Sequence, residues 1–411
     1  MPRSQRLLTL GLVLTTFGVA LEALSILPVA PMVAADLPGG MELYGLLFAA
    51  FFFGSAVAIV VAGPIVDRRG PAPVLVVGLG AFMAGLVVGG LAPSMELLVV
   101  GRFIQGAGAG MVNAVSFATV ALAYAPADRS RVLALFSLAW LLPSVIGPLL
   151  GGIVAEALGW RWVFLGLAVL MPLCALLVVP QVLAMPRGVA GSLPVGGRVR
   201  SILPPAGQVR VAALVTLLAS MAILGAVSFA PLALTDIRGL SSVEAGVTIA
   251  ILSISWSAGT FLQGRFPRVP TATVARVGVG CLVAGLPVVA LSAVPDVPLP
   301  LTWLGWLATG VGAGLMSQGT SLHLMAHAAA GSEGRATAAG QLASVSGNGI
   351  GTWLGGVLLG TALAAGLALE GALTVVFAGC TGAAVLGLLA TFWMSRSTVV
   401  ERHARVSADG G

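Results

Sequence analysis

The sequence has little charge and no lysine. Only 8% of its 411 residues are charged, 58% are hydrophobic, and the mean hydropathy is +1.07. A soluble domain carries about a quarter charged residues, so this composition excludes a mainly water-exposed protein. Most of the chain is therefore expected to lie in a lipid bilayer.

Cysteine is also scarce, and Cys174, Cys281 and Cys380 all fall within apolar stretches. They predict neither a disulfide framework nor a metal site. No loop is long enough for an independent domain, no nucleophile–base constellation is present, and no basic patch lies on a soluble domain. We therefore expect neither an enzyme nor a resident cofactor, and no nucleic-acid partner.

Long apolar stretches dominate what is present. Each is long enough for the roughly 20 residues that cross a bilayer as a helix. No alternating ten-residue pattern indicates barrel strands. We predict an all-α membrane protein with 12 transmembrane helices near 7–33, 43–66, 73–91, 97–123, 132–157, 162–184, 209–234, 245–262, 274–294, 299–326, 337–363 and 371–394.

The chain also repeats itself. Residues 106–110 (GAGAG) return as 310–314 (GVGAG), and residues 146–152 (IGPLLGG) return as 350–356 (IGTWLGG), both offset by 204 positions. Such a period is too long for a solenoid. It is typical of secondary transporters built from two similar halves, with the substrate site between them.

The repeat predicts two pseudo-symmetric six-helix bundles, residues 1–185 and 209–396. Between them, residues 186–208 are rich in proline, glycine and arginine, which predicts a cytoplasmic linker. Residues 397–411 are expected to form a cytoplasmic tail.

The distribution of arginine predicts the orientation. Of the 20 basic residues, 17 fall at the two ends or in even-numbered loops, and only Arg161 and Arg238 fall in odd-numbered loops. Loops rich in basic residues stay in the cytoplasm. We therefore expect a multi-pass protein of the plasma (inner) membrane with both termini cytoplasmic, working as a monomer.

Glu22 is the only acid well inside a predicted span, and Arg102 lies a few residues inside the outer end of another span. A charged carboxylate at the bilayer centre costs roughly 2.5–3.5 kcal/mol, so such residues face a cavity or a partner. We predict that Glu22 carries a coupling proton and that Arg102 is its partner. The alternatives are a permanently protonated glutamate or a structural ion pair.

Two polar stripes at helical spacing predict walls of a substrate cavity. Gln105 and Asn113 share a helix face with Arg102, and Gln341, Ser344 and Asn348 form a similar stripe in the second half. Aromatic residues are expected to add an apolar pocket, although core or lipid contact is their commoner fate. The predicted cavity residues are Gln105, Asn113, Trp140, Phe229, Trp256, Gln341 and Asn348. His323 and His327 are expected at the wet cytoplasmic end of their helix.

Two further motifs concern conformational change. The turn at Asp67, Arg68 and Gly70 lies between two spans, where a carboxylate can cap a neighbouring helix. We predict a conformational gate formed by Gly63, Asp67, Arg68, Gly70 and Arg129. The second motif is a small-residue face, Gly147, Pro148, Gly151 and Gly152, expected to pack closely against a helix of the opposite half.

These residues resemble the major facilitator superfamily, of the drug:proton antiporter type. The resemblance covers nearly the whole chain. The loop motif G-x-x-x-D-R-x-G-R-[RK] of that family is matched at Gly63, Asp67, Arg68 and Gly70, with Pro71 and Ala72 replacing the trailing basic pair.

Three further motifs of the family are present. R-x-x-Q-G-x-G-x-G/A is matched at residues 102–110, G-P-x-x-G-G at 147–152 and W-R-W-x-F at 160–164. Residues 21–37 are similar to the first helix of the multidrug branch, with Glu22 at its acid position. In the second half, Arg268 stands where the loop motif has its acid.

The resemblance implies an exporter that exchanges a small amphipathic substrate for protons by alternating access, with the proton gradient as energy source. A uniporter or an exporter of one metabolite is the alternative within the class. A membrane receptor on the same fold is a further alternative, but the short loops offer no large partner surface.

Overall fold

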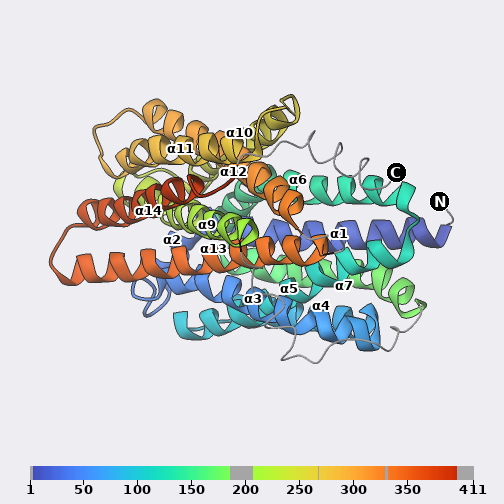
Figure 1. Cartoon of the computed structure of the whole chain (residues 1–411). Coiled ribbons are helices and arrows are strands. Elements are labelled where there is room, and N and C mark those ends of the chain that lie inside the picture. The colour runs from blue at the N-terminus through green and yellow to red at the C-terminus, as the bar shows by residue number, and fades with distance from the viewer. Residues whose placement is uncertain (1–2, 186–206, 267, 329–331, 396–411) are drawn as a thin grey trace. The chain divides into compact units, whose positions relative to one another are not determined.

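The computed structural model describes residues 3–185, 207–266, 268–328 and 332–395, and within these ranges it consists of helices joined by short turns and loops, with no strand (Figure 1). Helices satisfy their backbone hydrogen bonds internally, as a bilayer demands. The first part of the chain forms α1 (Arg3–Ser25), η1 (Leu27–Val29), α2 (Ala30–Asp36), α3 (Tyr44–Arg69), α4 (Pro71–Gly90), α5 (Met95–Ala123), α6 (Pro126–Leu158) and α7 (Arg161–Leu183).

The second part repeats this plan. It forms α9 (Gln208–Leu232), η2 (Ala233–Ile237), α10 (Ser242–Gly264), α11 (Thr271–Ala290), η3 (Leu291–Ala293), α12 (Leu299–His327), α13 (Glu333–Ala364) and α14 (Leu369–Thr391). In the described residues, 11 helical segments are long and apolar enough to cross a membrane. With 32 residues α13 has the length, but polar and glycine residues make it less apolar. The predicted all-α membrane fold is confirmed.

The chain packs as two compact units. The first comprises Met1–Arg200 and Leu240–Ala250, and the second comprises Ser201–Gly239 and Ile251–Gly411. The start of α10 thus packs with the first unit. The predicted linker and tail lie almost wholly outside the described residues, and the predicted bundle boundaries remain a prediction.

Glycines set the close packing of α5 in the first unit. A methyl group added at Gly106 would run into the backbone of Phe51 on α3, and one at Gly108 would meet the backbone of Gly78 and Phe82 on α4. Such contacts allow only residues without a side chain, because helix backbones lie against each other. The GAGAG motif therefore holds α5 between two neighbours.

The second unit uses the same device. Gly312 on α12 lies against the carbonyl of Gly278 on α11, as Gly108 lies against Gly78. Gly312 follows Gly108 by 204 positions, and Gly278 follows Gly78 by 200 positions. The repeat seen in the sequence is therefore a repeat of helix contacts.

The predicted partner is wrong for Gly147 and Gly151 on α6. Gly147 lies beside Leu21 and Ser25 of α1, and a methyl added at Gly151 would collide with the Ser25 carbonyl, so both face a helix of their own unit. Gly152 lies against the backbone at the start of α10, a helix of the predicted second bundle whose first residues pack with the first unit. A stripe of small residues indicates that another helix packs closely, but it does not identify which helix that is.

Candidate functional site

The centre of the candidate site is an ion pair between α1 and α5. Arg102 Nη1 donates to Glu22 Oε1, and the two side chains are 2% and 0% exposed. The sequence-based pairing of these residues is confirmed. An isolated buried charge would be very costly in this environment, which is why these two buried charged groups meet each other.

Arg102 has three further contacts that hold its guanidinium in place. Its Nη1 also donates to Gln105 Oε1 at 2.8 Å, and its Nε donates to the Leu47 carbonyl on α3 at 3.2 Å. Its Cζ lies 4.6 Å from the ring centroid of Phe51, a cation–π distance. Arg102 is therefore anchored to α3 and α5 independently of Glu22.

Glu22, unlike Arg102, has few contacts that hold its side chain in place. Its Oε2 is buried and meets no hydrogen-bond partner among the described residues, and the same holds for Gln105 Nε2. Buried polar atoms are normally satisfied, so an unpaired carboxylate oxygen is an exception that calls for an explanation. A carboxylate with one paired and one unpaired oxygen can accept a proton at the unpaired oxygen without first losing its partner.

The packing of α6 positions this carboxylate. Leu21 and Ser25, which lie one residue before and three residues after Glu22, are the α1 residues that Gly147 and Gly151 contact. Ser25 Oγ also donates to the Leu21 carbonyl at 2.6 Å. The small-residue face of α6 therefore fixes the segment of α1 that carries Glu22.

The other predicted cavity residues have varied surroundings. In the first unit Asn113 is half-buried and Trp140 is 41% exposed. In the second unit Gln341 is exposed, Trp256 and Asn348 are half-buried, and Phe229 is fully buried with its ring against Gly355. Ser344 and Ser220 join α13 to α9 by a 3.1 Å hydrogen bond. Their role as cavity residues remains a prediction.

Four of the predicted gate residues lie in the last two turns of α3 or at its connection to α4, and Arg129 lies near the start of α6. Gly70 has φ +80°, which favours glycine, and it lets α4 begin at once with Pro71. Arg129 Nε donates to the Tyr124 carbonyl at 3.0 Å, Arg68 is exposed, and no atom lies within 4 Å of a methyl built on Gly63. The side chain of Asp67 lies outside the described part of the structure.

The expectation for His323 is wrong. Its side chain is fully buried, with Nδ1 3.0 Å from Thr271 Oγ1 and Nε2 3.1 Å from Gln208 Oε1. His327 is half-buried and donates from Nδ1 to the His323 carbonyl at 3.0 Å. The histidine pair therefore ties α9, α11 and α12 together, because hydrogen-bonded partners replace the water that we expected.

Sequence reasoning missed the residues that anchor Arg102. Leu47 acts through its backbone carbonyl and Phe51 through its ring, and neither residue type stands out in an apolar helix. A second omission is a polar cluster between α2 and α7, where Trp160 Nε1 and Arg161 Nη1 donate to Asp36 Oδ2 at 2.9 and 2.8 Å. The W-R-W-x-F motif was the available signal for this cluster.

Fold and site together define a multi-pass integral membrane protein with a buried ion pair between its helices. The profile of the Major Facilitator Superfamily matches residues 8–352. The chain belongs to this superfamily, whose members transport small molecules across membranes.

Relatives with similar sequences carry multidrug names. The chain is 32% identical over 158 residues to the multidrug transporter protein MdtP of Bacillus subtilis, which covers 38% of this chain and 29% of that protein. It is 32% identical over 155 residues to the multidrug efflux pump SdrM of Staphylococcus aureus, covering 38% and 34%. The matches therefore span about a third of these relatives' own lengths.

Solved structures extend the likeness of fold to the whole chain. A bacterial homologue of the human lysosomal transporter Spinster has a TM-score of 0.76 at 19% identity, covering 97% of this chain and 100% of that one. A D-xylose-proton symporter has a TM-score of 0.75 at 15% identity, covering 95% and 97%. At these identities the likeness concerns the fold alone.

Proposed function

We propose that this protein is a proton-coupled exporter of small amphipathic molecules that works by alternating access. The observation that carries the proposal is the buried Glu22, paired with Arg102 through one oxygen and unpaired at the other among the described residues. The multidrug names of the partial relatives support the substrate class. The G-P-x-x-G-G motif at residues 147–152 supports the direction of transport.

In this proposal the coupling proton binds at Glu22. Protonation neutralises the carboxylate and removes most of its attraction to Arg102, while the Leu47 carbonyl and the Phe51 ring still hold the guanidinium. Helix α1 is then freer to move relative to α5. Substrate and proton thus compete for binding near Glu22. Because only one of them is bound at a time, the inward movement of a proton is coupled to the outward movement of substrate.

The proposed setting is the plasma (inner) membrane. The arginine bias supports an orientation with the connection between α3 and α4 and both termini in the cytoplasm. The transporter works as a monomer, with its small-molecule substrate, protons and the lipid bilayer as its only partners.

Transport by purified protein in proteoliposomes tests this proposal. An imposed pH gradient should drive accumulation of several lipophilic cations or neutral amphipathic compounds, and a protonophore should abolish it. Transport of one metabolite only would favour the dedicated exporter, and transport that ignores the gradient would favour the uniporter. No movement of any compound across a broad panel would contradict the proposed function.

Asp67 is predicted to act as a conformational latch and not as a substrate ligand. We expect Asp67→Asn to slow turnover about tenfold, which corresponds to ~1.4 kcal/mol on the barrier, with equilibrium substrate affinity nearly unchanged. Turnover in proteoliposomes and binding in detergent measure the two quantities separately. Asp128→Asn, at the start of α6, is the matched control. A large loss of affinity at unchanged turnover would reject the latch.

A further inference from the structure

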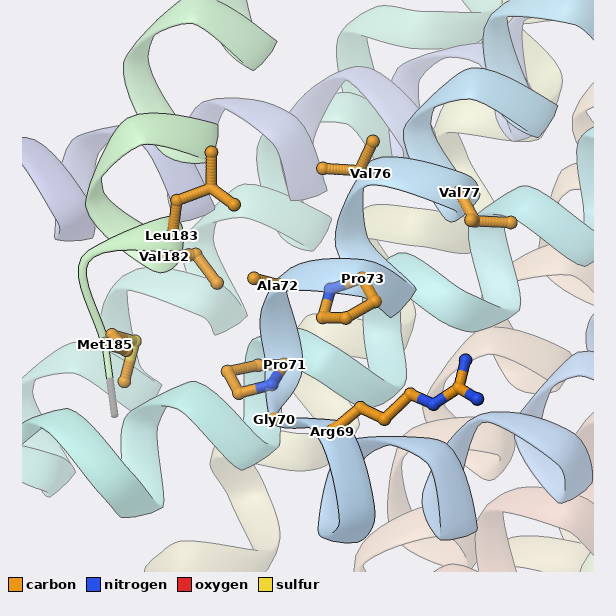
Figure 2. A pocket seen from close by; sticks show the side chains of 10 residues that line it. All are labelled: Arg69, Gly70, Pro71, Ala72, Pro73, Val76, Val77, Val182, Leu183 and Met185. Carbon is orange, nitrogen blue, oxygen red and sulfur yellow. The ribbon is translucent and has the colours of Figure 1, made fainter. Parts of the chain in front are cut away.

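A cavity of about 370 Å³ opens between α4 and α7, away from the Glu22 site (Figure 2). Pro73, Val76 and Val77 of α4 lie on one side of it, and Leu183 and Met185 lie on the other. Val77 and Leu183 are 58% and 62% exposed. The cavity is therefore an open apolar groove on the outside of the first unit.

One charged residue borders this groove. Arg69, the last residue of α3, lines it, and in Figure 2 its side chain extends below Pro73 on the α4 side, away from Leu183 and Met185. Arg69 is exposed and makes no hydrogen bond or ion pair with the rest of the described chain. Since Pro71 and Pro73 have no backbone N–H, the guanidinium is the main donor that this end of the groove offers.

In the second unit, an arginine side chain occupies the position that corresponds to this groove. Gly78 and Gly278 make equivalent contacts in α4 and α11, so an offset of 200 places Arg276 where α4 has Val76. Arg276 Nη2 donates to the Thr391 carbonyl at the end of α14 at 3.0 Å, and its Cζ lies 4.4 Å from the Phe392 ring centroid.

Thr391 ends a helix of 23 residues, as Leu183 ends α7. Arg276 therefore bridges, in the second unit, the two helix ends that the groove separates in the first. Valine at position 76 is too short and apolar to do this. The groove is thus a feature of this half and not a general consequence of the repeated fold.

We propose that this groove binds an anionic phospholipid. The acyl chain lies against the exposed valine and leucine side chains, and the phosphate is held by Arg69. Basic pockets at helix ends select anionic headgroups because the charge interaction is formed at the edge of a low-dielectric region. An unpaired arginine beside an apolar groove, in a protein that spans a membrane, matches both parts of such a lipid.

Lipid titration followed by native mass spectrometry tests this site on the full chain in detergent. We expect phosphatidylglycerol to bind about fivefold more tightly than phosphatidylcholine, the effect of one basic group at a membrane surface. Arg69→Gln should abolish that preference, and Val76→Phe should weaken the binding of both lipids by filling the groove. Arg268→Gln, next to the start of α11, removes an equivalent exposed charge and should change nothing.

The outcomes separate the proposal from a general charge effect. Equal losses in Arg69→Gln and Arg268→Gln would overturn it, as would equal binding of the two lipids by the unaltered protein. Displacement of phosphatidylglycerol by glycerol phosphate would show that only a phosphate is recognised, and would also reject a lipid site. Unchanged lipid binding by a monodisperse Val76→Phe protein would show that the lipid does not bind in this groove, and would also reject the proposal. None of these results depends on transport activity.

Discussion

Glu22→Gln is expected to abolish transport driven by a pH gradient while leaving the protein folded and able to bind substrate. Glutamine keeps the shape and one acceptor oxygen for Arg102, but it cannot bind or release a proton. A loss of coupling alone therefore leaves substrate exchange in the absence of a gradient. Gradient-driven uptake and substrate counterflow, measured in the same proteoliposomes, distinguish the two activities.

The control for this prediction is Glu370→Gln, which removes an exposed acid in the first turn of α14. It should transport at the rate of the unaltered protein. Full gradient-driven uptake by Glu22→Gln would contradict the proposed role of this carboxylate in proton coupling. Loss of both activities, with an intact substrate affinity, would instead indicate that the ion pair serves the conformational change itself.

The second large effect is expected at Gly151, and a single methyl group should suffice. Its added Cβ would overlap the Ser25 carbonyl, a backbone atom that cannot rotate away, so α1 must move. Gly147→Ala provides a matched control on the same face, because its Cβ would lie 3.3 Å from the Leu21 carbonyl and 3.4 Å from Leu24 Cβ. The sequence pattern does not distinguish the two positions, whereas the distances to α1 do.

We therefore expect Gly151→Ala to reduce transport by at least about tenfold, ~1.4 kcal/mol on the rate-limiting barrier, and Gly147→Ala to reduce it much less. Gly151→Leu should be inactive. The thermal midpoint of unfolding in detergent should fall in the same order, because overpacking strains the folded state. Wild-type transport by Gly151→Ala would show that the close approach of α1 and α6 is not needed for function.

The fold class and the central pair were predictable because each follows from a local rule. Helical spans follow from apolar length, since a bilayer leaves the backbone no other partner. The pairing of Glu22 with Arg102 follows from the cost of an uncompensated charge in the bilayer, because both residues lie inside spans of the first half. The internal repeat predicted two similar halves, and Gly108 and Gly312 make equivalent contacts within the two units.

Only the tertiary structure decided which surfaces meet. Helical periodicity shows that Gly151 lies on a small-residue face, but the partner depends on how six helices pack together, and the structure assigns α1 and not the opposite half. His323 was misjudged for the same reason, because its burial comes from residues far away in the chain. The anchors of Arg102 and the groove beside Arg69 involve backbone carbonyls and ordinary apolar side chains. Such groups acquire a role only when the fold brings them close to a charged side chain, so no pattern in the sequence predicts them.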